Sequence, residues 1–206
     1  MAMAEKKRIM SHKKVHHFRV INLLLIISLV ILFVGVVSGL SYVNTNLSNR
    51  IVAPSSTAFN QLMTHVVIKV PETNFSVSLS AETGKTVAYG DSTKDPYAGY
   101  GTVTIVPDYV LNISPKQYAA IVAINSGGSG EAFYLMYFIP KETGFQLTDS
   151  VYLGDRIRLE KFTLQKHRLS ISFLDHGPDQ AMVDAPNVPV TKSFSVTDDK
   201  LIVEEN

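Results

Sequence analysis

The sequence predicts an all-β globular domain, an antiparallel sandwich or partly closed barrel of about nine strands, preceded by one N-terminal transmembrane helix. Three observations predict this fold class. The run 20–43 contains no Asp, Glu, Lys or Arg. Beyond residue 62 the hydrophobic period changes to two, which is the spacing of a half-buried strand. No later segment of about ten residues shows the period of a helix.

The run 20–43 is rich in Leu, Ile and Val. As a helix it would be about 36 Å long, at roughly 1.5 Å per residue. The hydrocarbon core of a bilayer is about 30 Å thick, so this helix would cross it once with some tilt. A cleaved signal peptide is the alternative, but its apolar stretch usually has only about 7–15 residues. The sequence therefore predicts an uncleaved membrane anchor.

The charges on the two sides of this run predict its orientation. Residues 1–19 contain six basic residues and one acidic residue, whereas thirteen basic and seventeen acidic residues follow. Lys and Arg close to a span keep their side of it in the cytoplasm. We therefore expect a basic cytoplasmic tail over 1–19, a cell-membrane localisation and a C-terminal domain outside the cytoplasm. An arm that binds nucleic acid or a partner protein is the alternative for this tail, and no nucleic-acid partner is predicted.

Residues 44–61 are predicted to form a polar linker, because Asn, Ser and Thr are frequent and Pro54 disfavours a helix. Residues 62–206 are the predicted extracytoplasmic β domain. The chain contains no Cys, so the domain has neither disulfides nor thiolate metal ligands. About 140 residues are enough to bury a core that is stable without such crosslinks.

Alternating apolar and polar residues predict the half-buried strands of this domain. These strands are expected over 75–80, 102–105, 168–173 and 193–197. The segments 118–124 and 132–139 are instead apolar on both faces, which predicts central strands that are covered on both sides. Their expected partners are the segments 146–153, 156–164 and 201–204.

Short polar breaks separate the predicted strands. Glu82-Thr83-Gly84 and Glu142-Thr143-Gly144 place Gly third, which suits a type I turn followed by a left-handed residue. The segment 125–130, NSGGSG, is predicted to be a hairpin tip between the two most apolar strands, and 198–199 the last turn. These short connections predict that most neighbouring strands pair as antiparallel hairpins.

Polar residues near the predicted strand ends are the weak candidates for catalysis. They are Asp155 and Arg156, and Asp175 and His176 with Asp179 close behind. If they meet, His176 flanked by Asp175 or Asp179 would be a general base, as in an exported hydrolase. Arg156 would otherwise pair with one of these carboxylates and fix two loops. No G-x-S-x-G nucleophile elbow occurs, so the sequence favours a structural charge cluster.

The polar segment 91–101, DSTKDPYAGYG, contains the candidate binding residues Tyr97 and Tyr100. Exposed Tyr rings stack on sugars or anchor a partner chain. Alternatively, both rings fold back as lids on the end of the domain. The histidines outside the tail share no short metal-ligand spacing, so neither a metal nor a cofactor is predicted.

Five short motifs follow one another in the second half of the chain. They are GGSG at 127–130, FY at 133–134, LGDR at 153–156, HGPD at 176–179 and VTKSF at 190–194. In this order and spacing they resemble an uncharacterised family of bacterial envelope proteins that are anchored by a span or a lipid. The resemblance covers about half the chain. It implies a β fold and an envelope location, and it implies no activity.

These features lead to the hypothesis of a single-pass membrane protein with an extracytoplasmic binding module of the cell envelope. Its expected partners are the lipid bilayer, through the N-terminal helix, and another envelope protein or a cell-wall component. Two hypotheses stand beside it. One is the exported hydrolase that uses His176. The other is an auxiliary subunit of a membrane complex, whose span packs on a partner helix through Asn22, Gly35 and Gly39.

Overall fold

A computed structural model describes residues 28–33, 51–90 and 99–204. The chain divides into two compact units, residues 1–49 and 50–206. In the first unit residues 28–33 are helical, and the rest of the predicted span, with the basic tail, lies outside the described residues. The described ranges contain no helix with the length and apolarity needed to cross a membrane. The transmembrane helix therefore stays a prediction.

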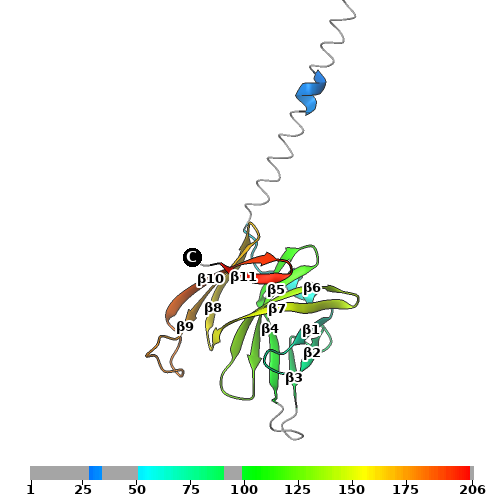
Figure 1. The fold of residues 1–206 in the computed structure, drawn as a ribbon. Coiled ribbons are helices and arrows are strands. Elements are labelled where there is room, and N and C mark those ends of the chain that lie inside the picture. Colours follow the sequence, from blue (N-terminus) through cyan, green and yellow to red (C-terminus); the bar gives the residue numbers. More distant parts are fainter. Residues whose placement is uncertain (1–27, 34–50, 91–98, 205–206) are drawn as a thin grey trace, which may run out of the picture. The chain divides into compact units, whose positions relative to one another are not determined.

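The described part of the second unit is built from eleven strands and one short helix (Figure 1). The elements are α2 (Ser56–Leu62), β1 (Val66–Lys69), β2 (Ser76–Leu79), β3 (Thr86–Tyr89), β4 (Gly101–Ser114), β5 (Gln117–Asn125), β6 (Ala132–Lys141), β7 (Gly144–Asp155), β8 (Arg158–Gln165), β9 (Arg168–Asp175), β10 (Val188–Thr197) and β11 (Lys200–Glu204). The all-β prediction is confirmed. The strand number exceeds the expected nine, because four-residue strands such as β1 and β3 are too short to show clear alternation.

The strands form two sheets. One has the order β2-β1-β7-β6-β5-β4-β3, and the other has the order β11-β10-β9-β8. Hydrogen-bonded neighbours are antiparallel, as predicted, except that β1 runs parallel to β7. The two outermost strands of the larger sheet, β2 and β3, contact each other, so this sheet curls around one face. The fold thus combines a curled sheet with a second sheet stacked on its outer face.

The larger sheet carries a hydrophobic core on each face. Alternate residues of β5 and β6 supply both cores: Val122 and Phe138 belong to the inner one, and Ile121 and Leu135 to the outer one. The outer core lies against β8 to β11, which contribute side chains such as Phe173. The segments 118–124 and 132–139 are therefore central strands covered on both sides, as their unbroken apolarity predicted. Of their expected partners, 146–153 pairs with β6, whereas 156–164 and 201–204 belong to the second sheet.

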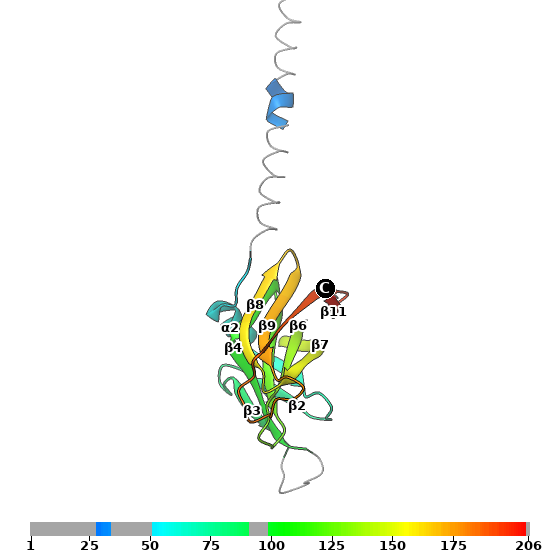
Figure 2. The ribbon, with the colours of Figure 1, turned by 90° about the vertical axis from the view of Figure 1, so that its left-hand side faces the viewer.

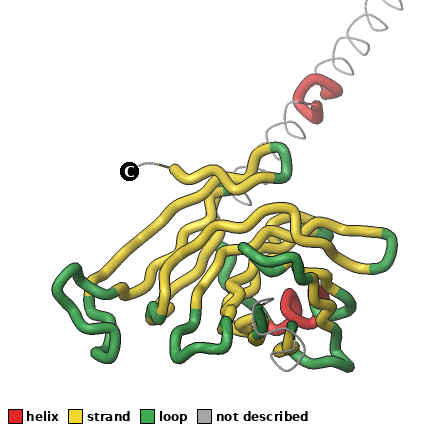
Figure 3. Tube along the Cα trace, turned by 60° about the horizontal axis from the view of Figure 1, so that its bottom comes forward, coloured by secondary structure: helices red, strands yellow, loops and turns green. Residues whose placement is uncertain are grey.

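Helix α2 occupies part of the predicted linker (the red helix within the domain in Figure 3). The Oγ of Ser55 accepts a hydrogen bond from the backbone N–H of Ala58 at 3.1 Å, which caps the helix. Ala58 and Leu62 are buried in the inner core, and Val52 pairs with Leu164 of β8. The predicted linker (44–61) therefore ends earlier than expected, because its C-terminal part belongs to the domain. Pro54 does not prevent this helix, because it precedes the capping residue.

The predicted turns occur where the polar breaks placed them. Gly84 and Gly144 have φ values of 81° and 121°, which only glycine adopts readily. Gly144 is also required by space, since a Cβ there would lie 2.2 Å from the carbonyl oxygen of His65. Two-residue turns with positive φ at both residues join β10 to β11 at Asp198-Asp199 and β8 to β9 at Lys166-His167.

Candidate functional site

The candidate residues from the sequence gather at one end of the domain. We define the loop end as the β5–β6 tip (126–131), the β7–β8 connection (156–157), the β9–β10 loop (176–187) and the strand ends next to them. Asp155, Arg156, Asp175 and His176 all lie there. Tyr97 lies outside the described residues. Figures 1 and 2 place the β8–β9 turn at the opposite end of the domain.

The β5–β6 tip is closed by Asn125, the last residue of β5. The side chain of Asn125 accepts a hydrogen bond from the N–H of Gly127 at 2.8 Å and donates to the carbonyl oxygens of Gly128 and Gly130. Gly127 has a φ of 80°, as this tight wrap requires. The NSGGSG segment is therefore the predicted hairpin tip, and its shape is fixed by the Asn side chain.

Tyr100 lies against this tip. A Cβ on Gly127 would lie 2.6 Å from the Tyr100 ring, so only glycine lets the ring approach so closely. The side chain of the neighbouring Ser126 is 3.2 Å from the hydroxyl of Tyr89, which is buried. Tyr100 itself is 40% exposed. The ring therefore both covers the tip and presents part of its surface to solvent.

Arg156 connects three chain segments at the loop end. Its Nη2 donates to the Oγ of Ser129 at 3.1 Å, and its Nη1 donates to the carbonyl oxygen of Met182 at 3.2 Å. Its Nε lies 3.6 Å from a carboxylate oxygen of Asp155, whose other oxygen accepts the N–H of Glu131 at 2.9 Å. Arg156 therefore joins two loops, but it does so through a hydroxyl and a carbonyl and not through the expected pair with Asp175 or Asp179.

Arg156 also has an unusual backbone conformation. Its φ is 53°, in the left-handed region that residues with a Cβ rarely adopt. Its N–H donates to the carbonyl oxygen of Glu131 at 3.0 Å, which ties the chain reversal after β7 to the β5–β6 tip. This conformation costs about 1 kcal/mol or more and persists where the surroundings hold it. The guanidinium contacts are such surroundings.

The histidine at the loop end is held by backbone groups. The Nε2 of His176 lies 2.9 Å from the carbonyl oxygen of Asp184, which can only accept, so Nε2 carries the proton. Its Nδ1 is buried and finds no partner within the described residues. Asp175 accepts the backbone N–H of His176 at 2.8 Å and makes no contact of that kind with the ring. Because the basic nitrogen is enclosed, this geometry does not offer a lone pair to a substrate.

Apolar side chains are exposed on the β9–β10 loop and beside it. Val183 is 89% exposed and Met182 is 42% exposed, on the loop whose backbone Arg156 holds. Tyr152 of β7 is 51% exposed, and its ring packs edge-on against Tyr134 at a centroid distance of 5.4 Å. Partial burial, and after it the carboxylates of Asp155 and other acids nearby, raises the pKa of Tyr152. The phenol therefore shares its surroundings with negative charge.

The loop end carries an excess of negative charge. Five carboxylates and two arginines lie on its segments: Glu131, Asp155, Asp175, Asp179, Asp184, Arg156 and Arg158. Within the described ranges, no cluster of His, Asp and Glu has the geometry of a metal site. Two open grooves, of about 440 and 620 Å³, lie elsewhere on the domain, and none of the predicted catalytic residues lines them.

The sequence patterns did not identify Met182, Val183 and Tyr152 as exposed residues of this end. A signal for the first two was present, since they form an apolar pair inside the otherwise polar segment 177–187. Comparisons of the chain with protein-family models, with curated proteins and with solved structures found no match. The resemblance to envelope proteins therefore stays a prediction.

Proposed function

We propose that this chain is a single-pass membrane protein whose β domain is an extracytoplasmic binding module of the cell envelope, with its binding surface at the loop end. The observation that carries the proposal is the β9–β10 loop, which presents Val183 and Met182 to solvent while Arg156 holds its backbone. A loop that is ordered before binding loses little conformational entropy when a partner docks.

The side chains at the loop end indicate the chemistry of the partner. Met and aromatic residues are enriched at the centres of protein interfaces, and Met adapts its shape to the surface it meets. The surrounding carboxylates favour a partner with basic residues and increase its association rate. We therefore expect an envelope protein with an apolar depression rimmed by Lys or Arg. This choice refines the broader expectation of an envelope protein or a cell-wall component.

The membrane anchor is supported by the charge-free run 20–43 and the basic residues before it. The described helical residues agree with this proposal, since the apolar side chains of 29–33 are 55–70% exposed. Lipid would cover such side chains. The alternative of an exported hydrolase has less support, because the Nδ1 of His176 is enclosed and its Nε2 is bonded to a carbonyl.

The absence of Cys from the chain allows a clean crosslinking experiment, because each introduced cysteine is the only one. Full-length Val183→Cys, carrying a photoactivatable maleimide in native membranes, should form one major protein adduct. Val203 of β11 is 55% exposed, so Val203→Cys is the matched control and should not form the adduct. Arg156→Lys in the Val183→Cys background should weaken the adduct, since Lys cannot donate to both loops. Equal adducts from both positions would contradict the proposed surface.

The same cysteines test the orientation of the chain. In spheroplasts, a membrane-impermeant maleimide should label Val183→Cys at once and should label Ser11→Cys of the basic tail only after permeabilisation. If Val183→Cys reacts only after permeabilisation, the domain is not extracytoplasmic and the proposed location is wrong.

A further inference from the structure

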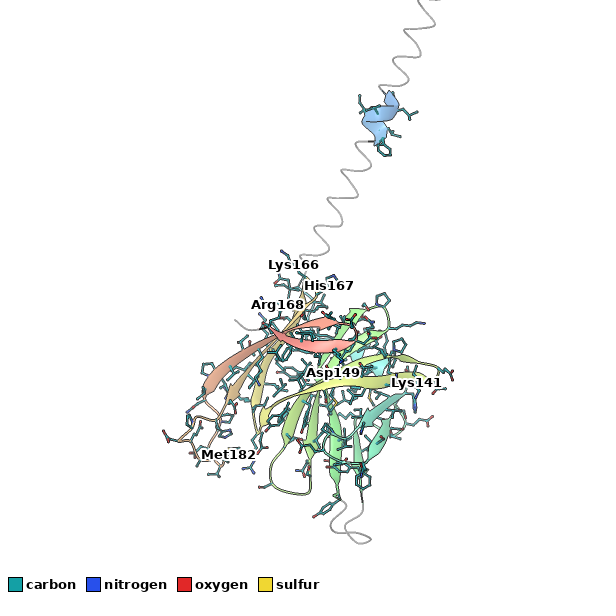
Figure 4. All side chains as sticks on the ribbon, in the orientation of Figure 1. Lys141, Asp149, Lys166, His167, Arg168 and Met182 are labelled. Atoms are coloured by element: carbon teal, nitrogen blue, oxygen red, sulfur yellow. The ribbon has the colours of Figure 1, made fainter. Side chains whose placement is uncertain are left out.

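The second sheet carries a basic groove on the face that points away from the core. The groove has a volume of about 620 Å³, and its lining includes Lys161, Thr163, Lys166, Arg168, Ser170 and Ser193. These residues come from β8, the β8–β9 turn, β9 and β10. Figure 4 shows Lys166, His167 and Arg168 at the end of the domain opposite Met182.

A row of hydroxyls forms the centre of the groove. Thr163 pairs with Ser170, and Ser170 pairs with Ser193, so the three side chains lie side by side on one face. Ser193 is only 6% exposed. Apart from tyrosines, it is the one buried residue with a polar side chain among the described residues. In the next row Ser172 and Thr191 bond each other at 3.0 Å. In the part of the chain that the structure describes, no side-chain hydrogen bond engages the hydroxyls of Thr163, Ser170 and Ser193.

Positive charge surrounds these hydroxyls. Arg168 is paired with Glu204, which also lines the groove. Among the described residues no carboxylate pairs with Lys161 or Lys166. The groove therefore has three cations and one carboxylate around a set of small donors. An oxyanion such as a phosphate group matches this arrangement, because it accepts several hydrogen bonds and carries the opposite charge.

The turn that positions two of these cations is strained. Lys166 and His167 have φ values of 50° and 63°, in the left-handed region that residues with a Cβ rarely adopt, although His adopts it more readily than Lys. A turn of this type is most stable with Asn-Gly. Strained residues that persist often have a functional reason, and here the turn places Lys166 and Arg168 on the rim of the groove.

The groove lies where the chain enters the domain. Ile51 contributes to its lining, and Val52 pairs with Leu164 of β8. The predicted span ends at Val43, so seven residues separate it from Ile51, and this length of chain can reach at most about 29 Å. The length of this connection limits how far Ile51 can lie from the end of the predicted span. We propose that the groove binds the phosphate of an anionic lipid headgroup in the membrane that holds the anchor, an inference that rests on the proposed membrane location.

The test uses full-length protein in a neutral detergent, with a fluorophore on Ile51→Cys at the groove. Short-chain phosphatidylglycerol should change the fluorescence in a saturable way at low salt, and short-chain phosphatidylcholine should not. Lys161→Gln combined with Lys166→Gln should weaken the apparent affinity by roughly tenfold to thirtyfold. The matched control, Lys69→Gln combined with Lys141→Gln, removes the same charge away from the groove and should bind like the parent protein. Circular dichroism checks that each variant is folded.

Three results would overturn the inference. They are equal responses to the two lipids, no difference between the groove variant and the matched control, and saturation by millimolar inorganic phosphate with no further response to phosphatidylglycerol. The last result would show a site for free phosphate instead of a lipid headgroup. Because the titration is done in detergent, it can succeed even if maleimide labelling contradicts the extracytoplasmic location, so the two failures are distinguishable.

Discussion

The two ends of the domain differ in charge and in the way their side chains are held. At the loop end Arg156 and Asn125 bind several backbone groups, and five carboxylates accompany exposed apolar residues. At the basic groove the side chains stand on paired strands, and two lysines have no ionic partner within the described ranges. At the loop end, a few side-chain hydrogen bonds determine the conformation of the loops. At the basic groove, the hydrogen-bonded strands of the second sheet hold the positively charged side chains in place.

This difference predicts unequal tolerance to mutation. A contact that joins three segments is lost as a unit when its central residue is removed, because its neighbours act together. An exposed ion pair on a sheet contributes little, because water and salt screen it. Substitutions at the loop end should therefore change both folding and binding. Substitutions on the paired strands of the groove should change binding and leave folding nearly unaltered.

The largest effect is expected from Arg156→Met, compared with Arg168→Met at the groove. Arg156→Met removes two hydrogen bonds from a charged donor and should lower the free energy of unfolding by about 2 kcal/mol. Arg168→Met removes one exposed ion pair and should lower it by at most about 1 kcal/mol. Urea denaturation of both full-length variants measures the difference. Equal losses would show that Arg156 does not organise the loop end.

A smaller effect is expected from adding a methyl group within the β5–β6 tip. In Gly130→Ala the new Cβ would lie 2.9 Å from an oxygen of Asp155, so the carboxylate must move away from Glu131 and Arg156. We expect a loss of about 1–2 kcal/mol from this overpacking. Gly128→Ala is the control in the same tip, because its nearest atom would be 4.0 Å away. Thermal unfolding should separate the two variants, and equal behaviour would contradict the close packing at Gly130.

The sequence predicted the sheet better than it predicted the ends. The segments 118–124 and 132–139 are central strands because unbroken apolarity has one favourable outcome, burial on both faces. Helix α2 was not expected, since seven residues are too few to show helical periodicity and its stability comes from packing. The Lys166-His167 turn gave no signal either, because it lacks the Asn, Asp or Gly that marks such turns in a sequence.

The candidate residues were partly predictable for a similar physical reason. Asp155, Arg156 and Asp175 follow strand ends, so their presence at one end of the domain follows from sheet topology. Their partners do not follow from the sequence, because Arg156 binds a hydroxyl and a carbonyl from loops that are 27 and 26 residues away along the chain. The hydroxyl row of the groove depends on the register between β8, β9 and β10, which local sequence patterns do not determine.

A gain in stability is expected at the groove end. Replacing Lys166-His167 by Asn-Gly keeps the two-residue turn and places the two residues that adopt positive φ most readily at its positions. The free energy of unfolding should rise by about 1 kcal/mol. Lipid binding in the fluorescence titration should weaken at the same time, since Lys166 is lost from the groove. Unchanged stability would mean that the turn is not strained. The rim of the groove would then not differ in strain from the sheet that carries it.

The smallest effect concerns alkaline pH at the loop end. Burial, followed by Asp155 and Asp175, raises the pKa of Tyr152 above its ordinary value of 10.0. The folded state then holds this proton more tightly than the unfolded state. The resulting stability is complete below pH 10 and is lost as the pH rises through the higher pKa of the folded state. Tyr152→Phe should therefore lose less stability than the parent protein between neutral pH and pH 11 in urea titrations. An identical loss in both proteins would mean that neither burial nor the nearby carboxylates hold the Tyr152 proton more tightly in the folded state.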